Sequence, residues 1–153
     1  MILISHRGNL SGQNETQENT SKYIDDALRG GYHAEIDVRF KDGHLWMGHD
    51  EPDEKVSLAW LFKNANTLWI HCKDIESIML LNEVDDGSLN YFGHSSDDFV
   101  LTSKGFLFCL PSDVLNHRCV LVMPEFFGFE MKEDNAAYAV LTDFPSTFKE
   151  EQT

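Results

Sequence analysis

Six side chains that can bind a metal or move a proton lie in, or at the end of, four short apolar segments. Side chains alternate across a β-strand, so residues two positions apart point the same way. Glu35 and Asp37 therefore share one face, and His71 and Lys73 share a face of a later segment. The full set is His6, Glu35, Asp37, His49, His71 and Lys73. If these faces line one end of a sheet, carboxylates, imidazoles and an amine meet there.

The carboxylate pair needs a partner of opposite charge. Glu35 and Asp37 lie in an apolar segment of the kind that forms a buried strand. Burying a carboxylate without a compensating partner costs free energy. A hard divalent cation with oxygen ligands is one such partner. Lys73 is the alternative, through a simple ion pair with either carboxylate. The spacing leaves both partners open.

The histidines suit proton transfer at neutral pH. An unperturbed imidazole has a pKa near 6.5, which lets it act as a general acid or base. His6 and His49 each end an apolar segment. The alternative for each is a core histidine held by hydrogen bonds. The other histidines near loops are expected in solvent, and the tryptophans are expected to serve packing. These loop histidines are His33, His44 and His117.

The apolar runs predict strands, and capping residues predict the helices between them. We expect strands over 2–5, 34–40, 45–49, 68–73, 90–94, 120–123 and 138–141, with a hairpin over 99–110 split at 102–105. Asp42-Gly43 is a turn that brings the second and third strands close. Asn19 or Thr20 can cap a helix that Gly30-Gly31 ends, and Ser57 can cap a helix over 58–64. A further helix is expected over about 75–84, and the tail from residue 145 is expected to fray.

Strands alternating with helices indicate a parallel α/β sheet. An open sheet normally binds phosphate at a glycine-rich turn, and the chain has no GxGxxG or Walker motif. Polar residues instead follow several separate strands, as in a β/α barrel. A full barrel takes about 250 residues, whereas this chain has 153. The prediction is one domain, residues 1–153, folded as a small trimmed TIM-type β/α barrel with some outer helices missing in its second half.

Composition and charge exclude several classes of partner. The formal net charge is −14 and the sequence pI about 4.7, with no basic run, which argues against binding nucleic acid or anionic lipid. No segment has the length of a signal peptide or a membrane span. The three cysteines are odd in number and form no CxxC pair, so we expect free thiols in the cytoplasm. A Cys109–Cys119 pair is the alternative for an exported protein.

Five short motifs follow one another over residues 4–50. They are Ile-Ser-His-Arg-Gly at 4–8, Glu-Asn-Thr at 18–20, Glu-Ile-Asp-Val at 35–38, Asp-Gly at 42–43 and His-Asp at 49–50. In order and spacing this set resembles the N-terminal signature of the glycerophosphodiester phosphodiesterase family. Near the other end, Thr-Asp-Phe-Pro at 142–145 resembles the ending of that family's last strand.

The resemblance implies roles for individual residues. In that family the two histidines form the acid/base pair, the Glu and Asp of ExD hold a Mg²⁺ or Ca²⁺ ion, and the arginine contacts phosphate. Carried over, the acid/base pair is His6 and His49, the ligands are Glu35 and Asp37, and the phosphate contact is Arg7.

Three departures separate the chain from the family pattern. The family's fourth strand carries ExK with a metal-binding glutamate, whereas this chain has His71-Cys72-Lys73. Lys73 is kept, and His71 replaces the glutamate with a ligand that favours softer ions. The loop over 51–57 is too short for the family's insertion that shapes the glycerol pocket. Segments 98–105 and 122–125 look like those of a short, divergent branch.

The sequence therefore predicts a metal-dependent phosphoric diester hydrolase for a small glycerophosphodiester-like or sugar-phosphate substrate. One divalent ion, Mg²⁺ or Ca²⁺ with Mn²⁺ as an alternative, would bind Glu35 and Asp37, with His71 or Glu125 as candidate third ligand. Arg7 and Lys73 would bind phosphate oxygens. The alternatives are a non-catalytic phosphate or sugar-phosphate binding module on a degenerate barrel, and an unrelated small barrel. No nucleic acid and no membrane insertion are expected, and missing helices would favour a homodimer.

Overall fold

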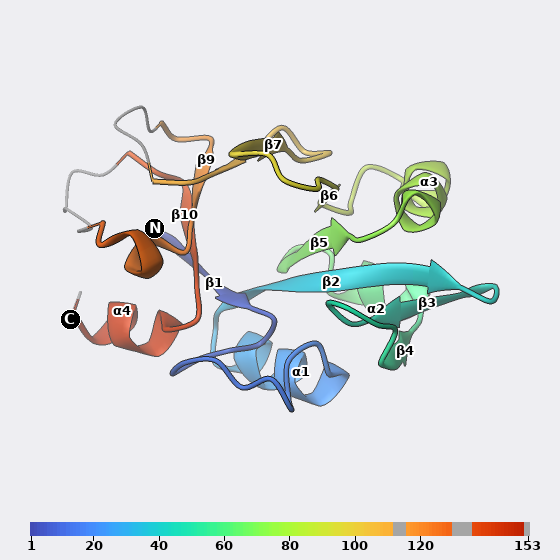
Figure 1. Cartoon of the computed structure of the whole chain (residues 1–153), viewed down its shortest axis with the longest axis horizontal. Coiled ribbons are helices and arrows are strands. Elements are labelled where there is room, and N and C mark those ends of the chain that lie inside the picture. Colours follow the sequence, from blue (N-terminus) through green and yellow to red (C-terminus); the bar gives the residue numbers. More distant parts are fainter. Residues whose placement is uncertain (112–115, 130–135, 152–153) are drawn as a thin grey trace.

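The computed structural model describes residues 1–111, 116–129 and 136–151. Within these ranges the fold is mixed α/β, with a ten-stranded mixed sheet and few helices (Figure 1). The strands are β1 (Ile2–His6), β2 (His33–Lys41), β3 (His44–Met47), β4 (Glu54–Val56), β5 (Leu68–Cys72), β6 (Tyr91–Phe92), β7 (Phe99–Leu101), β8 (Leu107–Cys109), β9 (Cys119–Val122) and β10 (Ala139–Thr142). The helices are α1 (Ser21–Arg29), α2 (Leu58–Lys63), α3 (Ile75–Val84), the 3₁₀-helix η1 (Pro124–Phe127) and α4 (Pro145–Glu151).

Parallel pairing runs through most of the sheet. β1 pairs with both β2 and β10, β2 pairs with β5, β5 with β6, β10 with β9, and β9 with β8, all in parallel. The two ends of this parallel run come close, because Ser103, just after β7, donates its backbone N–H to the Tyr91 carbonyl of β6 at 2.8 Å. Tyr91 N–H in turn donates to Ser103 Oγ at 3.0 Å. The parallel strand ends therefore face a common region (Figure 1).

The third predicted strand needs a correction. The turn expected at Asp42-Gly43 is confirmed, but residues 45–49 were expected as a strand of the parallel sheet, whereas β3 pairs antiparallel with β2. Only Asp42 and Gly43 separate the two strands, both with positive φ, and a parallel connection needs about a dozen residues or more. β2 is long enough to pair with β5 through its first part and with β3 through its second. The hairpin expected over 99–110 is confirmed as antiparallel β7 and β8.

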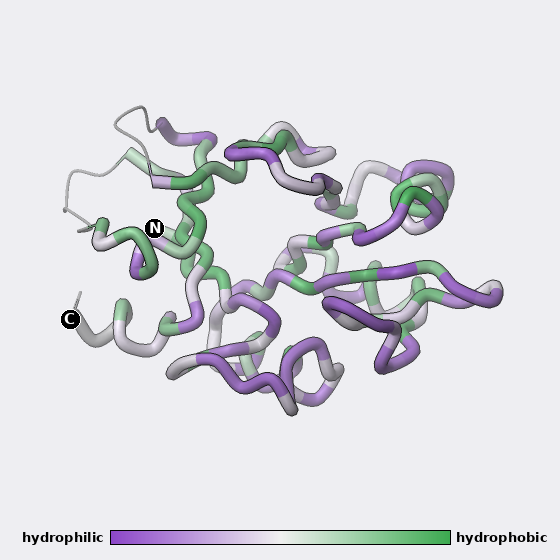
Figure 2. Tube along the Cα trace, viewed as in Figure 1, coloured by the Kyte–Doolittle hydropathy of each residue, from purple (hydrophilic) through white to green (hydrophobic). Residues whose placement is uncertain are grey.

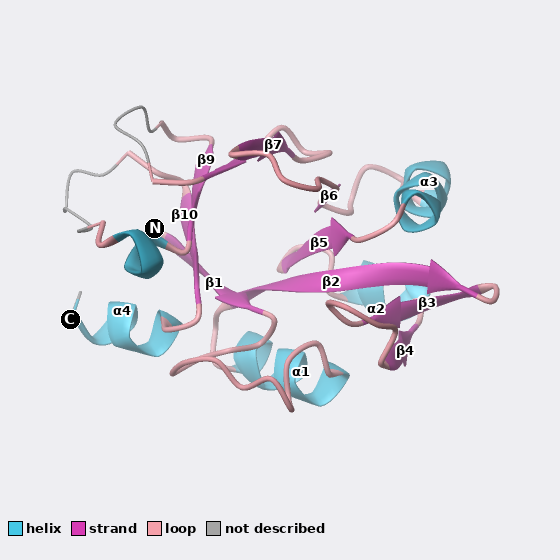
Figure 3. Ribbon diagram, viewed as in Figure 1, coloured by secondary structure: helices cyan, strands magenta, loops and turns pink. Residues whose placement is uncertain are grey.

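The helices lie outside the curved sheet (Figure 3). Thr20, Ser57 and Asp74 cap α1, α2 and α3, each side chain accepting a backbone N–H of the first turn. The connection from β6 to β8 holds β7 and no helix, as expected for a trimmed second half. The tail from residue 145, expected to fray, forms α4. Across the described residues, no helix is both long and apolar enough to cross a membrane.

Two apolar clusters form most of the core. One lies between β2, β5 and the first three helices, around Ile36, Ile70 and Leu81. The other lies among β1, β5, β6, β8, β9 and β10, and includes Ile4 and Trp69. Figure 2 shows apolar residues along β1, β9 and β10, and polar residues in the loop before α1. Ile4 lies on the same face of β1 as His6, and Trp69 lies on the same face of β5 as His71. The apolar cluster therefore lies below these polar side chains.

Candidate metal and acid–base site

Glu35, Asp37 and His71 form a buried group on the part of β2 that pairs in parallel with β5, and near the carboxyl end of β5. Asp37 and His71 are register partners in this parallel pair, which places their side chains together. His71 Nδ1 lies 3.1 Å from Asp37 Oδ1 and 3.7 Å from Glu35 Oε1. One ligand atom from each residue lies within 4.8 Å of the others. The side chains predicted to share a metal are therefore close enough to do so.

The donor set fits a cation. Glu35 is 3% exposed, and its Oε2 has no hydrogen-bond partner among the described residues. Burial, followed by the charge of Asp37, raises the pKa of Glu35 to about 7. Burial also acts to raise the pKa of Asp37, but the His71 hydrogen bond and the Arg7 charge outweigh it and leave that pKa lowered. Two buried carboxylates with an unpartnered oxygen suit a divalent ion.

Asn19 and Arg7 hold Asp37 in place. Asn19 Nδ2 donates to Asp37 Oδ2 at 3.0 Å, and Asn19 Oδ1 accepts the Asp37 backbone N–H at 2.9 Å. Arg7 Nε lies 2.9 Å from Asp37 Oδ2, and Arg7 also contacts Glu18. Arg7 and Asn19 both have positive φ, a conformation that asparagine adopts more readily than most residues. Lys73 Nζ is 3.8 Å from Asp37 Oδ1, so the predicted lysine pairing is present as well.

Aromatic rings fix the plane of His71. The ring stacks on Phe92 at 4.9 Å between centroids and on His94 at 4.7 Å, with interplanar angles of 9° and 8°. Burial lowers the pKa of His71 despite its hydrogen bond to Asp37. A neutral, fixed imidazole is the form that binds metal ions.

His6 is paired with Asp143, the residue directly after β10. His6 Nδ1 lies 2.8 Å from Asp143 Oδ1, which also accepts from Asn9 Nδ2 at 2.8 Å. Because a carboxylate only accepts, this contact places a proton on Nδ1 and leaves Nε2 for proton exchange. Burial acts to lower the pKa of His6, but the Asp143 hydrogen bond and the Glu35 charge outweigh it and raise that pKa. Pairing of β1 with β2 and β10 brings His6 between Glu35 and Asp143.

The hairpin of β2 and β3 brings the chain at His49 back beside Asp37. Gly48, just before it, donates its N–H to the Asp37 carbonyl at 3.2 Å. Arg39 fixes the turn by donating to the carbonyls of Gly48 and His49. His49 Nδ1 contacts Asp50 Oδ1 at 2.8 Å, so its Nε2 is also left for proton exchange. The side chain is 40% exposed, in contrast to 15% for His6.

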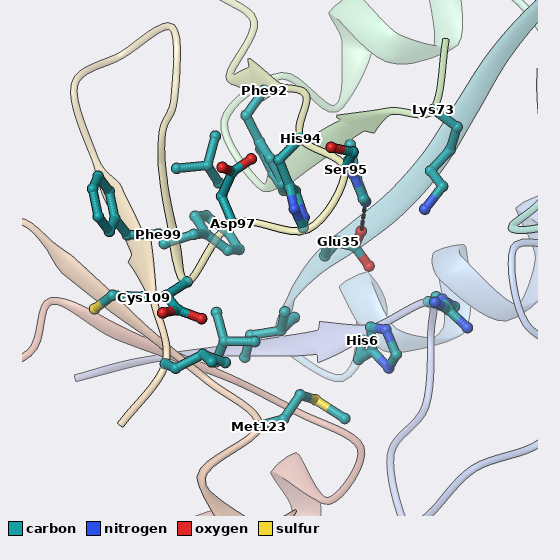
Figure 4. Close-up of a pocket in the computed structure, with 18 of the residues that line it drawn as sticks. His6, Glu35, Lys73, Phe92, His94, Ser95, Asp97, Phe99, Cys109 and Met123 are labelled. Carbon is teal, nitrogen blue, oxygen red and sulfur yellow. Dashed lines mark ion pairs between the residues drawn. The ribbon is translucent and has the colours of Figure 1, made fainter. Parts of the chain in front are cut away.

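A cavity of about 320 Å³ joins these groups. Six predicted site residues line it: His6, Arg7, Glu35, His49, His71 and Lys73. Figure 4 shows His6, Glu35 and Lys73 along one side of this cavity. Asp37 lies beneath, fully buried, and supports the others.

Other predicted residues lie elsewhere. Glu125, a candidate third ligand, is not in the group of three described above. Its Oε1 accepts from Thr142 Oγ1 at 2.7 Å and from the Asp143 N–H at 3.1 Å. His44 is exposed as expected, whereas His33 is half-buried and accepts from Trp69 Nε1 at 3.2 Å. The roles of Asn19 and Asp143 were not predicted, although both stand in the motifs that carry the resemblance.

The arrangement brings together groups of the kinds that bind anions, hold cations and move protons. Two cations, two imidazoles with Nε2 left for proton exchange and a carboxylate-rich cation site border one cavity. Comparison with family models, with curated proteins and with solved structures finds no match to this chain.

Proposed function

We propose that this protein is a metal-dependent phosphoric diester hydrolase. One observation carries the proposal. His6 and His49, each with a carboxylate at Nδ1, line the same cavity as the buried Glu35 carboxylate, the neighbouring His71 imidazole and the cation Arg7. Proton donors, proton acceptors, positive charge and a cation site in one cavity are what hydrolysis of a phosphodiester requires.

The fold that we propose for this activity is an incomplete β/α barrel. Support comes from the seven parallel-paired strands of the described chain, β1, β2, β5, β6, β8, β9 and β10, and from the hydrogen bonds between Ser103 and Tyr91 at their two ends. His6 and His71 lie at or near the carboxyl ends of β1 and β5, where β/α barrels place catalytic groups.

Glu35, Asp37 and His71 would hold the divalent ion. Mg²⁺, Ca²⁺ and Mn²⁺ all accept carboxylate ligands, and the imidazole adds a nitrogen donor. Bound there, the ion would supply positive charge to phosphate oxygens. Asn19 and Arg7 keep Asp37 ionised and correctly oriented, through the contacts to its carboxylate and backbone.

Arg7 and Lys73 would bind the non-bridging oxygens of the phosphate. Both line the cavity, and their charges offset those of the substrate in an otherwise acidic protein. Charge-assisted hydrogen bonds of this kind are about twice as strong as neutral ones.

His6 and His49 would share the proton transfers. One Nε2 removes a proton from an attacking water molecule, whose oxygen forms the new bond to phosphorus. The other protonates the leaving oxygen as its bond to phosphorus breaks. The contacts with Asp143 and Asp50 keep each ring oriented and keep its proton on Nδ1.

Hydrolysis of bis(4-nitrophenyl) phosphate with Mg²⁺, Ca²⁺ or Mn²⁺ in turn tests the proposal. We expect metal-dependent release of nitrophenol, lost on addition of EDTA. The double variant Glu35→Gln, Asp37→Asn should lose both turnover and the heat of metal binding in calorimetry. Glu83→Gln, which removes an exposed carboxylate of α3, should leave both unchanged.

Two results would contradict the proposal. Metal affinity that is unchanged in the double variant would remove Glu35 and Asp37 from the ligand set. Metal and phosphate binding without turnover of any diester would favour the non-catalytic binding module.

A further inference from the structure

We propose, resting on the proposed function, that one ester group of the substrate is compact and apolar, and that it occupies the end of the cavity formed by β7–β10. The glycerol or sugar group that the family resemblance implies would not be recognised there.

The cavity has two chemically distinct ends. Opposite the polar groups, its wall consists of apolar side chains from β7 to β10 and the residue after β8: Phe99, Val100, Phe108, Leu110, Val122 and Leu141. Figure 4 shows His6, Glu35 and Lys73 toward one side, and Phe99 and Cys109 toward the other. A phosphate held by Arg7 and Lys73 therefore directs one substituent along an apolar wall.

This wall offers few partners to a polyol. Cys109 Sγ is turned to the Val120 carbonyl at 3.8 Å. The other polar side chains on this side are Asp97 and Asp98, from the loop after β6, whereas Ser95 lies toward Glu35 (Figure 4). Hydroxyls buried against apolar side chains without hydrogen bonds lose free energy, whereas methylenes gain it. The acidic loop side chains also disfavour a second anionic group.

The size of the cavity limits the group it accepts. About 320 Å³ is near the lower bound of small-molecule sites, about 300 Å³. Since the phosphate takes part of this volume, a short alkyl chain or one aromatic ring fills the remainder. Phe99 is 66% exposed, which places it at the rim.

Calorimetric titration with n-hexyl phosphate, glycerol phosphate and inorganic phosphate, in Mg²⁺, tests the inference. Each methylene moved from water to an apolar wall contributes a factor of about four in affinity. We expect hexyl phosphate to bind at least about tenfold more tightly than glycerol phosphate. Arg7→Gln should weaken binding of all three.

A matched pair of variants locates the apolar group. Phe99 and Leu101 belong to the same strand and are each 66% exposed, but only Phe99 is among the cavity residues. Phe99→Ser should lower hexyl phosphate affinity several-fold and leave inorganic phosphate unchanged, whereas Leu101→Ser should change neither. Val122→Thr, nearly isosteric, should act like Phe99→Ser.

The outcomes separate the two proposals. Glycerol phosphate that binds as tightly as hexyl phosphate would overturn the apolar preference and leave the proposed function standing. Equal effects of Phe99→Ser and Leu101→Ser would overturn its location in the cavity. No binding of any of the three phosphates would overturn the proposed function, and the inference with it.

Discussion

His6 and His49 have similar partners but different surroundings. Each has an aspartate at Nδ1, at 2.8 Å, while His6 lies between buried strands and His49 on an exposed hairpin end. Acid/base groups contribute about 10² to 10⁴ in rate each. We predict that His6→Ala and His49→Ala each lower turnover by about this factor and leave metal affinity nearly intact in calorimetry.

The leaving group distinguishes the two roles. Nitrophenol needs little protonation because its pKa is low, so a nitrophenyl ester should rescue the variant that lacks the acid. The variant that lacks the base should stay impaired with every ester. Turnover unaffected by either substitution would contradict the acid–base assignment.

The sequence could predict the residues of the site but not the contacts that hold them. Alternation along a strand placed Glu35 with Asp37, and the expectation of a parallel barrel brought His71 beside them. The partner of His6 is Asp143, which is 137 positions away, and no local pattern carries that distance. Asn19 was interpreted as a candidate helix cap, but Thr20 has that role and Asn19 holds Asp37. Such roles depend on which strands become neighbours.

At the scale of elements, the hairpin that delivers His49 depends on one glycine. Gly48 has φ +149°, and a Cβ there would lie 1.9 Å from the Glu51 carbonyl oxygen. Gly43, in the turn between β2 and β3, also has positive φ but has open space around it. Gly43→Ala should therefore cost only the backbone strain, about 1 kcal/mol. Gly48→Ala must also displace backbone, so we predict a clearly larger loss in urea unfolding and a lower turnover.

The two glycine variants control for each other. Both add one methyl group and both strain a positive φ, so the difference between them measures the close approach at Gly48. Equal losses of stability would mean that the loop after β3 rearranges without a further cost in stability and does not fix the position of His49.

The sequence predicted helices correctly where the signal for them is local. Capping residues correctly predicted α1 and α2, since a cap acts within one turn. The direction of β3 was wrong because the shared parallel pattern was given more weight than the two-residue turn. β4 and α4 were missed because their short polar segments have no clear periodicity, and they form by pairing with β3 and by packing near β1.

At the scale of the molecule, two cationic side chains lie where the net charge of −14 would otherwise repel a phosphate. Arg7 and Lys73 lie at the cavity beside buried carboxylates. Without a bound cation, these acidic groups lower the stability of the folded state, because Glu35 is buried beside Asp37. The metal-free protein should therefore respond to pH through this site.

In EDTA, burial and the Asp37 charge keep Glu35 protonated in the folded state up to about pH 7, whereas the unfolded carboxyl ionises near its usual value of 4.5. Between these two pH values the folded state binds more protons, so the free energy of unfolding falls as pH rises. One pKa unit corresponds to about 1.4 kcal/mol, which gives a total on the order of 3 to 4 kcal/mol. The measurement is the difference between variants, because the contributions of all other titratable groups cancel in it. We predict that Glu35→Gln gains stability relative to the unmodified chain from pH 5 to pH 8 in urea unfolding, and that Glu83→Gln does not.

Saturating divalent metal at pH 8 should restore the stability of the unmodified chain and should stabilise Glu35→Gln less. Parallel stability curves for the unmodified chain and Glu35→Gln would mean that Glu35 stays ionised without metal.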